Sequence, residues 1–369
     1  MSSNLVEQFS TLTDPRSEKN KLYALTDILV LSVCAIVSGA DGWEAIERFG
    51  NNKLDWLRQY IKLENGIPSH DCISWVFSRI PPKKLQDCFV KWTENVVNLT
   101  EGEVISIDGK TARRSYDKKL NCPAIHMVSA WANNNGMSLG QVATEKKSNE
   151  ITAIPELLEM LLIKGCIVTI DAMGCQKTIA KKIIEKEADY VLAVKGNQKF
   201  LHKAIIQHFE THDLHDIASS PLSFYEETDH GHGRTEIRRY WLSDDLTMIP
   251  KAEQWEGLCS IGLAEREYFE NGKRRIEKRY YIISFKDDAK VFGHAVRQHW
   301  GVENSLHWVL DVVFREDDSR IRRGHSPVNF NTLRQISLNL LKKEKSKTSI
   351  KQKRFESALN DDFRAKVMF

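Results

Sequence analysis

Two aspartates occupy matched positions in the sequence, each directly after an apolar run that predicts a strand. Asp108 follows Val104–Ile107 and precedes Gly109. Asp171 follows Cys166–Ile170. Because strands of a buried sheet expose functional groups at their carboxyl ends, we expect the two side chains to meet there. Carboxylates that close cannot both stay ionised without a proton or a divalent cation between them, and hard oxygen ligands suit Mg²⁺ or Mn²⁺. The alternative is that each aspartate only caps the turn after its strand.

A third carboxylate is available on a predicted helix late in the chain. His299, Glu303 and His307 are spaced four residues apart and therefore share one helix face, and Asp311 lies near the same face. Either histidine could in principle bind a metal, but a His-x-x-x-Glu pattern is frequent by chance. The sequence therefore offers Glu303 as the residue that could complete a two-metal carboxylate site.

Three blocks of sequence must position these carboxylates. Apolar residues at three- and four-residue spacing predict helices in the first block, over 25–37, 43–49, 54–60 and 85–97. The second block predicts strands over 104–107, 126–132, 137–144, 166–170 and 190–194, with helices over 153–163 and 176–187. This alternation is typical of a mixed sheet covered by helices. The third block is strand-like over 224–241 and 258–284, with a hairpin turn at Asn271-Gly272, before helical periodicity returns over 290–313 and 328–343.

Composition narrows the class of protein. The 369 residues carry 53 basic and 50 acidic side chains, so the net charge of +3 names no partner. The seven cysteines form no C-x-x-C pair, which argues against a disulfide framework and a cysteine-built zinc site. The most apolar run, Ile28–Val37, is ten residues long including Ser32, which is shorter than the ~18 residues that span a bilayer. We therefore expect a cytoplasmic protein with no membrane segment.

Positive charge is concentrated near the carboxyl end. Between Ser319 and Arg354 there are eleven Lys or Arg residues against one acid, Glu344. Such a run is either a solvated helix face with a frayed tail or a surface that contacts the phosphates of a nucleic acid.

Five spaced motifs together resemble the H-repeat-associated transposases, which belong to the bacterial DDE insertion-sequence transposases. The motifs are Ser106-Ile107-Asp108-Gly109-Lys110-Thr111, Lys147-Ser148-Asn149-Glu150-Ile151, Thr169-Ile170-Asp171-Ala172-Met173-Gly174-Cys175-Gln176, Lys195-Gly196-Asn197-Gln198 and His299-Trp300-Gly301-Val302-Glu303-Asn304-Ser305-Leu306-His307-Trp308. Asp14-Pro15-Arg16 and Gly66-Ile67-Pro68-Ser69-His70-Asp71 look like the helical domain that precedes the catalytic core in that family. The resemblance covers nearly the whole chain.

The resemblance implies an α/β fold with an RNase H-like mixed five-stranded sheet flanked by helices. It places a helical domain at 1–100, a catalytic domain at 101–345 with a β-rich insertion at about 215–288, and a basic tail at 346–369. Asp108 would be the first catalytic aspartate, Asp171 the second and Glu303 the closing glutamate, with Mg²⁺ as the cofactor and Mn²⁺ as a substitute. The separations of 63 and 132 residues leave room for the insertion.

The sequence departs from the related pattern Tyr-x-x-Arg-x-x-x-Glu-x-x-x-x-x-x-Lys around the glutamate. The corresponding positions hold Val296, His299, Glu303 and Leu310. The His-Trp variant is found in the H-repeat branch, so Glu303 keeps its assignment. The contact that the lysine would make to a DNA end must then come from other residues or be absent.

The implied reaction is metal-dependent cleavage of double-stranded DNA at the element ends, followed by transfer of the 3′-hydroxyl to target DNA. Because two ends must be held together, we expect a homodimer in the active complex. The residues that we expect to contact DNA are Lys110, Lys195, Asn197, Arg234, His299, Arg320, Arg322 and Arg323. Two alternatives remain: a catalytically silent DNA-binding descendant of such a transposase, and a sequence-independent nuclease on the same fold.

Overall fold

The computed structural model describes residues 5–19, 21–116, 123–144, 150–214, 216, 220–231, 234–270, 273–286 and 288–369. The Lys147-Ser148-Asn149 part of the second motif, the Asn271-Gly272 turn and Cys122 lie outside these residues. Among the helices that the structure describes, none is long and apolar enough to cross a lipid bilayer.

The first hundred residues form a helical layer. Its helices are α1 (Leu5–Ser10), α2 (Leu25–Val37), α3 (Trp43–Asn52), α4 (Leu54–Leu57), α5 (His70–Phe77) and α6 (Pro82–Val96). Nearly every side chain of α2 is buried, which is expected of a helix that is apolar on all sides and lies at the centre of its layer. The helices predicted from periodicity are confirmed, although α4 is shorter and α6 begins three residues earlier than predicted.

The strands form one mixed sheet with the order β3-β2-β1-β4-β5-β9-β8-β7-β6. They are β1 (Val104–Thr111), β2 (His126–Ala132), β3 (Met137–Thr144), β4 (Ile167–Ile170), β5 (Asp189–Val194), β6 (Ser223–Gly231), β7 (Arg234–Ser243), β8 (Ser260–Glu270) and β9 (Lys273–Ile283). Strands β1, β4 and β5 are parallel to one another, and every other neighbouring pair is antiparallel.

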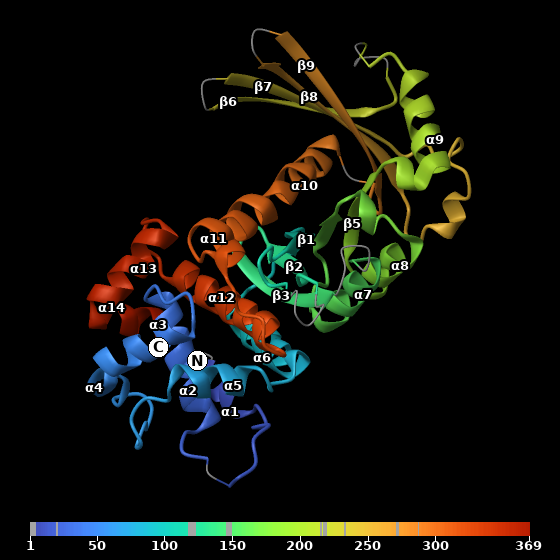
Figure 1. The fold of residues 1–369 in the computed structure, drawn as a ribbon. Helices are drawn as coiled ribbons and strands as arrows, with labels where there is room; N and C mark the ends of the chain where they lie inside the picture. Colours follow the sequence, from blue (N-terminus) through green and yellow to red (C-terminus); the bar gives the residue numbers. More distant parts are fainter. Residues whose placement is uncertain are drawn as a thin grey trace.

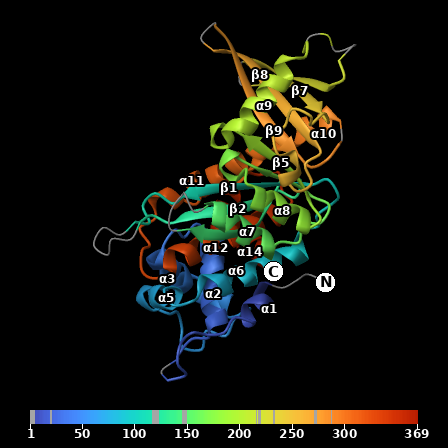
Figure 2. The same ribbon diagram turned by 90° about the vertical axis from the view of Figure 1, so that its right-hand side faces the viewer.

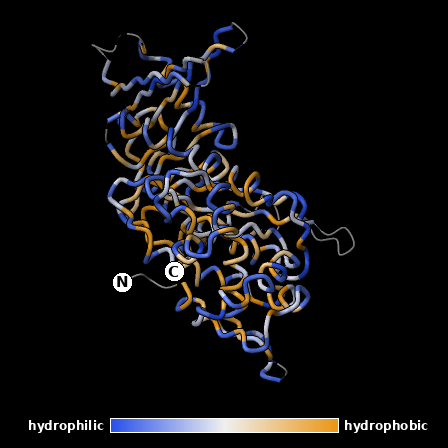
Figure 3. Tube along the Cα trace, turned by 90° about the vertical axis from the view of Figure 1, so that its left-hand side faces the viewer, coloured by the Kyte–Doolittle hydropathy of each residue, from blue (hydrophilic) through white to orange (hydrophobic). Residues whose placement is uncertain are grey.

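The sheet differs from the expected five strands because the β-rich segment continues it. Strand β9 pairs with β5 from Val191 opposite Ile283 to Val194 opposite Tyr280, so the sheet has nine strands. An uncovered β5 would leave a row of backbone amides and carbonyls without partners, and β9 provides them. Figures 1 and 2 show β6–β9 extending away from the helical layer. The first half of β9 is largely exposed, and the far end of this extension is mostly hydrophilic in Figure 3.

Helices cover both faces of the sheet near its centre. Helices α7 (Glu150–Met160), α8 (Lys177–Glu185) and α9 (Lys199–Glu210) pack with the face that includes Ile105 and Ile107. Helix α10 (Ala289–Val302) packs on the opposite face with Val104 and Ile167. These central strands are therefore buried on both faces, with Ser106 and Thr169 as buried polar residues on the face that α10 covers. Helix α7 begins three residues earlier than predicted, so Pro155 lies inside the helix rather than in its first turn.

The chain ends in helices rather than in the expected basic tail. After α11 (Trp308–Val312) come α12 (Ser326–Lys343), α13 (Ile350–Leu359) and α14 (Asp361–Met368), which lie against the first helical layer (Figure 1). Several of the basic residues are buried: the Arg354 guanidinium donates to the Ile36 carbonyl at 3.1 Å and lies over the Phe314 ring. The basic surface is therefore smaller than the residue count predicted.

Glu344, directly after α12, forms ion pairs with a lysine of α13 and a lysine of α14, and these pairs should contribute to stability. Its side chain is 1% exposed and pairs with Lys353 at 3.1 Å and Lys366 at 2.9 Å. Burial alone would raise the pKa of Glu344, but the hydrogen bonds from Lys366, Ser346 and Lys353 lower it to about 2. Because this pKa is lower in the folded protein than in the unfolded chain, the stabilisation is present above pH 4.5 and is lost as the pH falls towards 2.

We expect Glu344→Gln to lower the free energy of unfolding at pH 7 by about 3 kcal/mol, because the buried ammonium of Lys353 loses its carboxylate partner, whereas Lys366 is exposed and contributes little. Denaturant unfolding of both proteins between pH 7 and pH 3 measures the difference, which should narrow below pH 4.5. The matched control is Glu101→Gln, at an exposed position, with an expected change within about 0.5 kcal/mol. An equal effect of both substitutions would contradict this account of Glu344.

Candidate active site

The register of the central strands brings the two aspartates side by side. Ile107 of β1 is paired with Ile170 of β4, and the next residue in each strand direction is an aspartate. Asp108 and Asp171 therefore leave neighbouring parallel strands at the same level, on the face that α10 covers. Both line a cavity of about 370 Å³, and Glu303 lines it from the helix opposite. The structure thus gathers the three carboxylates that sequence reasoning selected.

A chain of hydrogen bonds fixes α10 over this edge of the sheet. The Asn133 amide donates to the Ser106 hydroxyl at 2.8 Å, and the Thr169 hydroxyl donates to the same oxygen at 3.2 Å. Because the Thr169 hydroxyl is used as a donor there, it accepts from Nδ1 of His299 at 3.0 Å. The Ser106 hydroxyl in turn donates to the carbonyl of Gln298 at 3.3 Å. The chain links β1 and β4 to the last turn of α10, directly before Glu303.

Glu303 begins a π-helical turn, Glu303–His307, inside what the sequence predicts as one continuous helix. The extra residue in a π turn changes which side chains face the sheet, and such turns occur frequently at functional sites. Glu303 is exposed to the cavity, whereas His307 points back to β1, with its Nδ1 3.5 Å from Oδ2 of Asp108. Periodicity predicted the helix correctly but gave no signal for the π turn.

The carboxylates share one electrostatic environment. Burial raises the pKa of Asp108 to about 7 against a backbone hydrogen bond from Gly109, and the charges of Asp171 and Glu303 act in the same direction as burial. Burial also lowers the pKa of His299 to about 4 and that of His307 to about 3. At neutral pH both imidazoles are therefore uncharged, and the negative charge of the site is not neutralised by them.

Asp171 caps the turn after its strand, which is the alternative that the sequence left open, and it also lines the cavity. Its Oδ1 accepts from the backbone amides of Met173 at 2.9 Å and Gly174 at 3.4 Å, which caps the short turn after β4. The side-chain amide of Asn197 donates to the Ala172 carbonyl at 2.6 Å and ties this turn to the loop after β5.

The carboxylates of Asp108, Asp171 and Glu303 are suitable ligands for a hard divalent cation, although they are not close enough together to form a metal site in this structure. Within the described residues, no three His, Cys, Asp or Glu side chains are already grouped as a metal site. The three carboxylates nevertheless line one cavity, and the pKa of Asp108 is raised there mainly by burial and further by the charges of Asp171 and Glu303. Oxygen donors of this kind suit Mg²⁺ and Mn²⁺ better than softer metals.

The residues expected to contact DNA are spread over several places. Lys195 is exposed and lines the cavity beside His299. Arg320 and Arg323 are exposed on the segment before α12, and Arg322 donates to the Arg114 carbonyl and lies over the Tyr116 ring. Arg234 begins β7, but its side chain lies outside the described structure.

Lys110 was expected to contact DNA, but in the structure its side chain is directed into the protein. Its ammonium pairs with Asp311 at 2.7 Å and with Glu316, and its side chain is 13% exposed. The lysine is therefore turned into the protein and is not available to a phosphate in this structure.

Sequence reasoning missed a buried pair behind Asp108. His126 Nε2 lies 2.5 Å from Oε1 of Glu150, and the His126 Nδ1 contacts the Thr111 hydroxyl at 2.8 Å. Both groups pack against Gly109, where an added Cβ would lie 2.4 Å from Glu150. Glu150 was visible as part of a motif, but nothing in the sequence paired it with His126.

Comparison with known proteins matches two regions of the chain. Residues 6–93 match the family described as DDE_Tnp_1-associated, and residues 99–340 match the Transposase DDE domain. "Putative transposase YncI" of Escherichia coli O157:H7 is 45% identical over 99% of this chain and 94% of that protein. "H repeat-associated putative transposase YhhI" of Escherichia coli strain K12 is 43% identical over 99% of this chain and 97% of that protein.

A solved structure is also similar at a low level. The piggyBac transposase in a synaptic complex with hairpin DNA aligns with a TM-score of 0.44 and 13% identity, over 98% of this chain and 78% of that one.

Proposed function

The chain belongs to the H-repeat-associated family of DDE transposases, and from that premise we propose that it cuts DNA at the ends of its element and joins the freed 3′-hydroxyl to target DNA. The observation that carries the proposal is the convergence of Asp108, Asp171 and Glu303 on one cavity at the carboxyl ends of β1 and β4. No covalent protein–DNA intermediate is part of the proposal.

We propose that Asp108, Asp171 and Glu303 hold divalent cations, with Mg²⁺ as the resident ion and Mn²⁺ as a substitute. When bound, such ions activate an attacking water or 3′-hydroxyl and stabilise the departing oxygen of a phosphodiester. The protein holds Asp171 in place through its turn and holds Glu303 in place through α10. The neutral His299 and His307 leave the carboxylate charge available for the ions.

We further propose that β3-β2-β1-β4-β5 is an RNase H-like core to which β9-β8-β7-β6 has been added as an insertion. Three parallel strands, β1, β4 and β5, flanked on one side by an antiparallel β2-β3 hairpin support this interpretation. Within it, residues 1–100 form a helical domain and the last helices complete that domain rather than forming a tail.

The DNA is proposed to enter beside Lys195 and His299, which line the same cavity as the carboxylates. Asn197 acts there mainly through its hold on the Asp171 turn. Arg234, Arg320, Arg322 and Arg323 remain proposed contacts to more distant phosphates. A homodimer would allow two ends to be cut together.

The experiment that tests the proposal incubates the full chain with DNA that carries the sequences flanking its gene, with Mg²⁺, with Mn²⁺ and with a chelator. We expect cleavage at defined ends and strand-transfer products with either metal and none with the chelator. Binding of the ends without cutting in either metal would overturn the proposal in favour of a silent descendant. Metal-dependent cutting at random positions without joining would favour a nuclease.

A further inference from the structure

Strand β1 and the helix that carries Glu303 face each other beside the cavity, and their polar side chains are in contact. On β1, Asp108 and Lys110 are two residues apart and so point to the same side of the sheet. On the helix opposite, Glu303, His307 and Asp311 follow one another at four-residue spacing. His307 contacts Asp108 at 3.5 Å, and Asp311 pairs with Lys110 at 2.7 Å. The strand and the helix are therefore joined at two successive levels.

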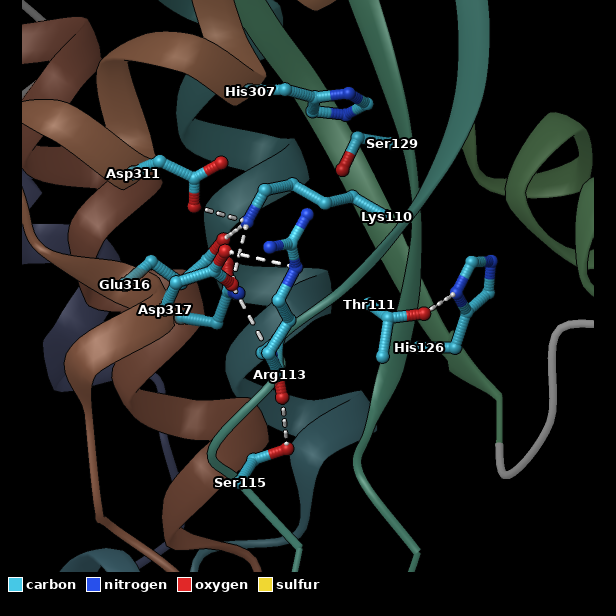
Figure 4. Close-up of polar contacts among 12 residues, drawn as sticks. Lys110, Thr111, Arg113, Ser115, His126, Ser129, His307, Asp311, Glu316 and Asp317 are labelled. Carbon is cyan, nitrogen blue, oxygen red and sulfur yellow. Dashed lines mark hydrogen bonds and ion pairs between the residues drawn. The ribbon is translucent and has the colours of Figure 1, made fainter.

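Of these two contacts, the one between Lys110 and Asp311 has more supporting interactions. Its ammonium pairs with Asp311 and Glu316, and Asp317 lies 3.8 Å away (Figure 4). The Glu316 side chain is 2% exposed, and its other oxygen accepts from the Asn331 amide of α12. Because Glu316 is almost fully buried, a missing ammonium would leave its carboxylate without a compensating charge. The lysine therefore ties β1 to the end of α11 and to α12.

The helix that carries Glu303 is consequently fixed on both sides of its π turn. Before the turn, His299 contacts Thr169 of β4. After the turn, Asp311 is bound to Lys110 of β1. Glu303 lies in the chain between these two fixed points, and its exposed side chain lines the same cavity as Asp108. Loss of the second point would free the π turn to move relative to Asp108.

We infer that Lys110 is a positioning residue, which holds the Glu303 turn against β1 through Asp311 and Glu316, and that it does not contact DNA. The inference rests on the proposed function, because it assigns Lys110 to the assembly of the same carboxylate site. It replaces the expectation that Lys110 binds a phosphate.

The test uses the full chain with Lys110→Met, Lys110→Arg and Asp311→Asn, and it uses Mn²⁺ as the probe, measured by electron paramagnetic resonance. We expect Lys110→Met and Asp311→Asn to weaken Mn²⁺ binding by about 10–100-fold, the usual effect of losing a group that orients a ligand. Combining Lys110→Met with Asp311→Asn should weaken Mn²⁺ binding little more than either substitution alone. Lys110→Arg should recover most of the affinity because it keeps the charge.

The same variants are tested for binding to DNA that carries the flanking sequences, over a range of salt concentrations. Under the inference, DNA affinity and its salt dependence stay those of the wild type. A phosphate contact predicts the opposite, namely weaker DNA binding and a salt slope smaller by about 1, with Mn²⁺ affinity unchanged, and that result would overturn it. The matched control is Arg113→Met: Arg113 pairs with Asp317 of the same acidic segment but is 82% exposed, so no change in Mn²⁺ binding is expected.

The outcomes separate this inference from the proposed function. If the wild type shows no Mn²⁺ site that Asp108→Asn removes, the proposed function fails and the inference falls with it. If the wild type binds Mn²⁺ and Lys110→Met binds it equally well, only the inference fails. A variant that merely loses stability would unfold at a lower temperature while keeping its Mn²⁺ affinity, which also counts against the inference. Should Lys110→Met not fold, Asp311→Asn decides the matter alone.

Discussion

Asp108→Asn is expected to abolish DNA cutting and joining, by a factor of about 10³ or more, while leaving the binding of DNA ends intact. The amide keeps the size of the side chain but provides a weaker ligand without charge, so the cation that activates the nucleophile is lost. Cleavage assays and end-binding assays on the same preparation measure both effects. Asp171→Asn and Glu303→Gln should reproduce this pattern, and retained cutting in any one of the three would remove that residue from the site.

The same substitution should make the metal-free protein more stable. The pKa of Asp108 is raised from 3.8 to about 7, so the folded protein retains a proton that the unfolded chain has already lost. Stability contributed by this group is therefore greatest below pH 3.8 and is lost as the pH rises through about 7. Above that pH the charged carboxylate costs up to about 4 kcal/mol, which the amide avoids.

Thermal unfolding at several pH values measures this effect. In a chelator, the melting temperature of Asp108→Asn should exceed that of the wild type by an amount that grows between pH 4 and pH 7. Added Mg²⁺ should raise the melting temperature of the wild type and leave the variant unchanged, because only the wild type binds the ion. A variant that is less stable than the wild type at pH 8 in chelator would contradict the electrostatic account of the site.

Local pattern explains why these carboxylates could be selected from the sequence. Asp108 and Asp171 end apolar runs that are buried on both faces, and such runs predict central parallel strands with functional groups at their carboxyl ends. Glu303 was reached by helical spacing together with the family motif. The pairing of Ile107 with Ile170, which brings the two aspartates level, is a long-range register that no local pattern specifies.

Other features could not be predicted because they depend on contacts between distant segments. The β-rich segment was expected as an insertion, but nothing in its sequence showed that β9 would pair with β5 and extend the sheet to nine strands. Lys110 was expected to contact DNA and Arg354 was counted in the basic run, yet each meets partners about 200 or more residues away in the chain. A charge count does not distinguish a solvated lysine from one that is buried with carboxylates.

Gly301→Ala gives the second large prediction, and the sign of its effect tests how α10 is fixed. Replacing a helical glycine by alanine normally stabilises a protein by about 0.5–1 kcal/mol. Here a Cβ would lie 2.0 Å from Oδ1 of Asn133. The Asn133 amide cannot turn away freely, since it donates to the Val104 carbonyl at 2.9 Å and to the Ser106 hydroxyl at 2.8 Å. We therefore expect destabilisation by about 1–3 kcal/mol.

The effect on activity should be larger than the effect on stability. Glu303 is only two residues beyond Gly301, so a shift of α10 away from Asn133 moves the carboxylate away from Asp108. A displacement of about 1 Å in a reacting site costs on the order of 100-fold in rate, and cleavage assays should show a loss of this size. Denaturant unfolding of the same variant gives the stability.

A second substitution separates the steric cause from a general weakening of the fold. Asn133→Ala alone should be destabilising because it removes two hydrogen bonds, but combined with Gly301→Ala it provides space for the new methyl group. The double variant should therefore be less impaired in cutting than the sum of the two single changes predicts. Gly42→Ala is the matched control, since an added Cβ there meets no atom within 4 Å. Strictly additive losses would mean that the contact between Gly301 and Asn133 does not set the position of Glu303, and that the other contacts of α10, which include the hydrogen bonds of His299 to Thr169 and of Ser106 to the Gln298 carbonyl, hold the helix without it.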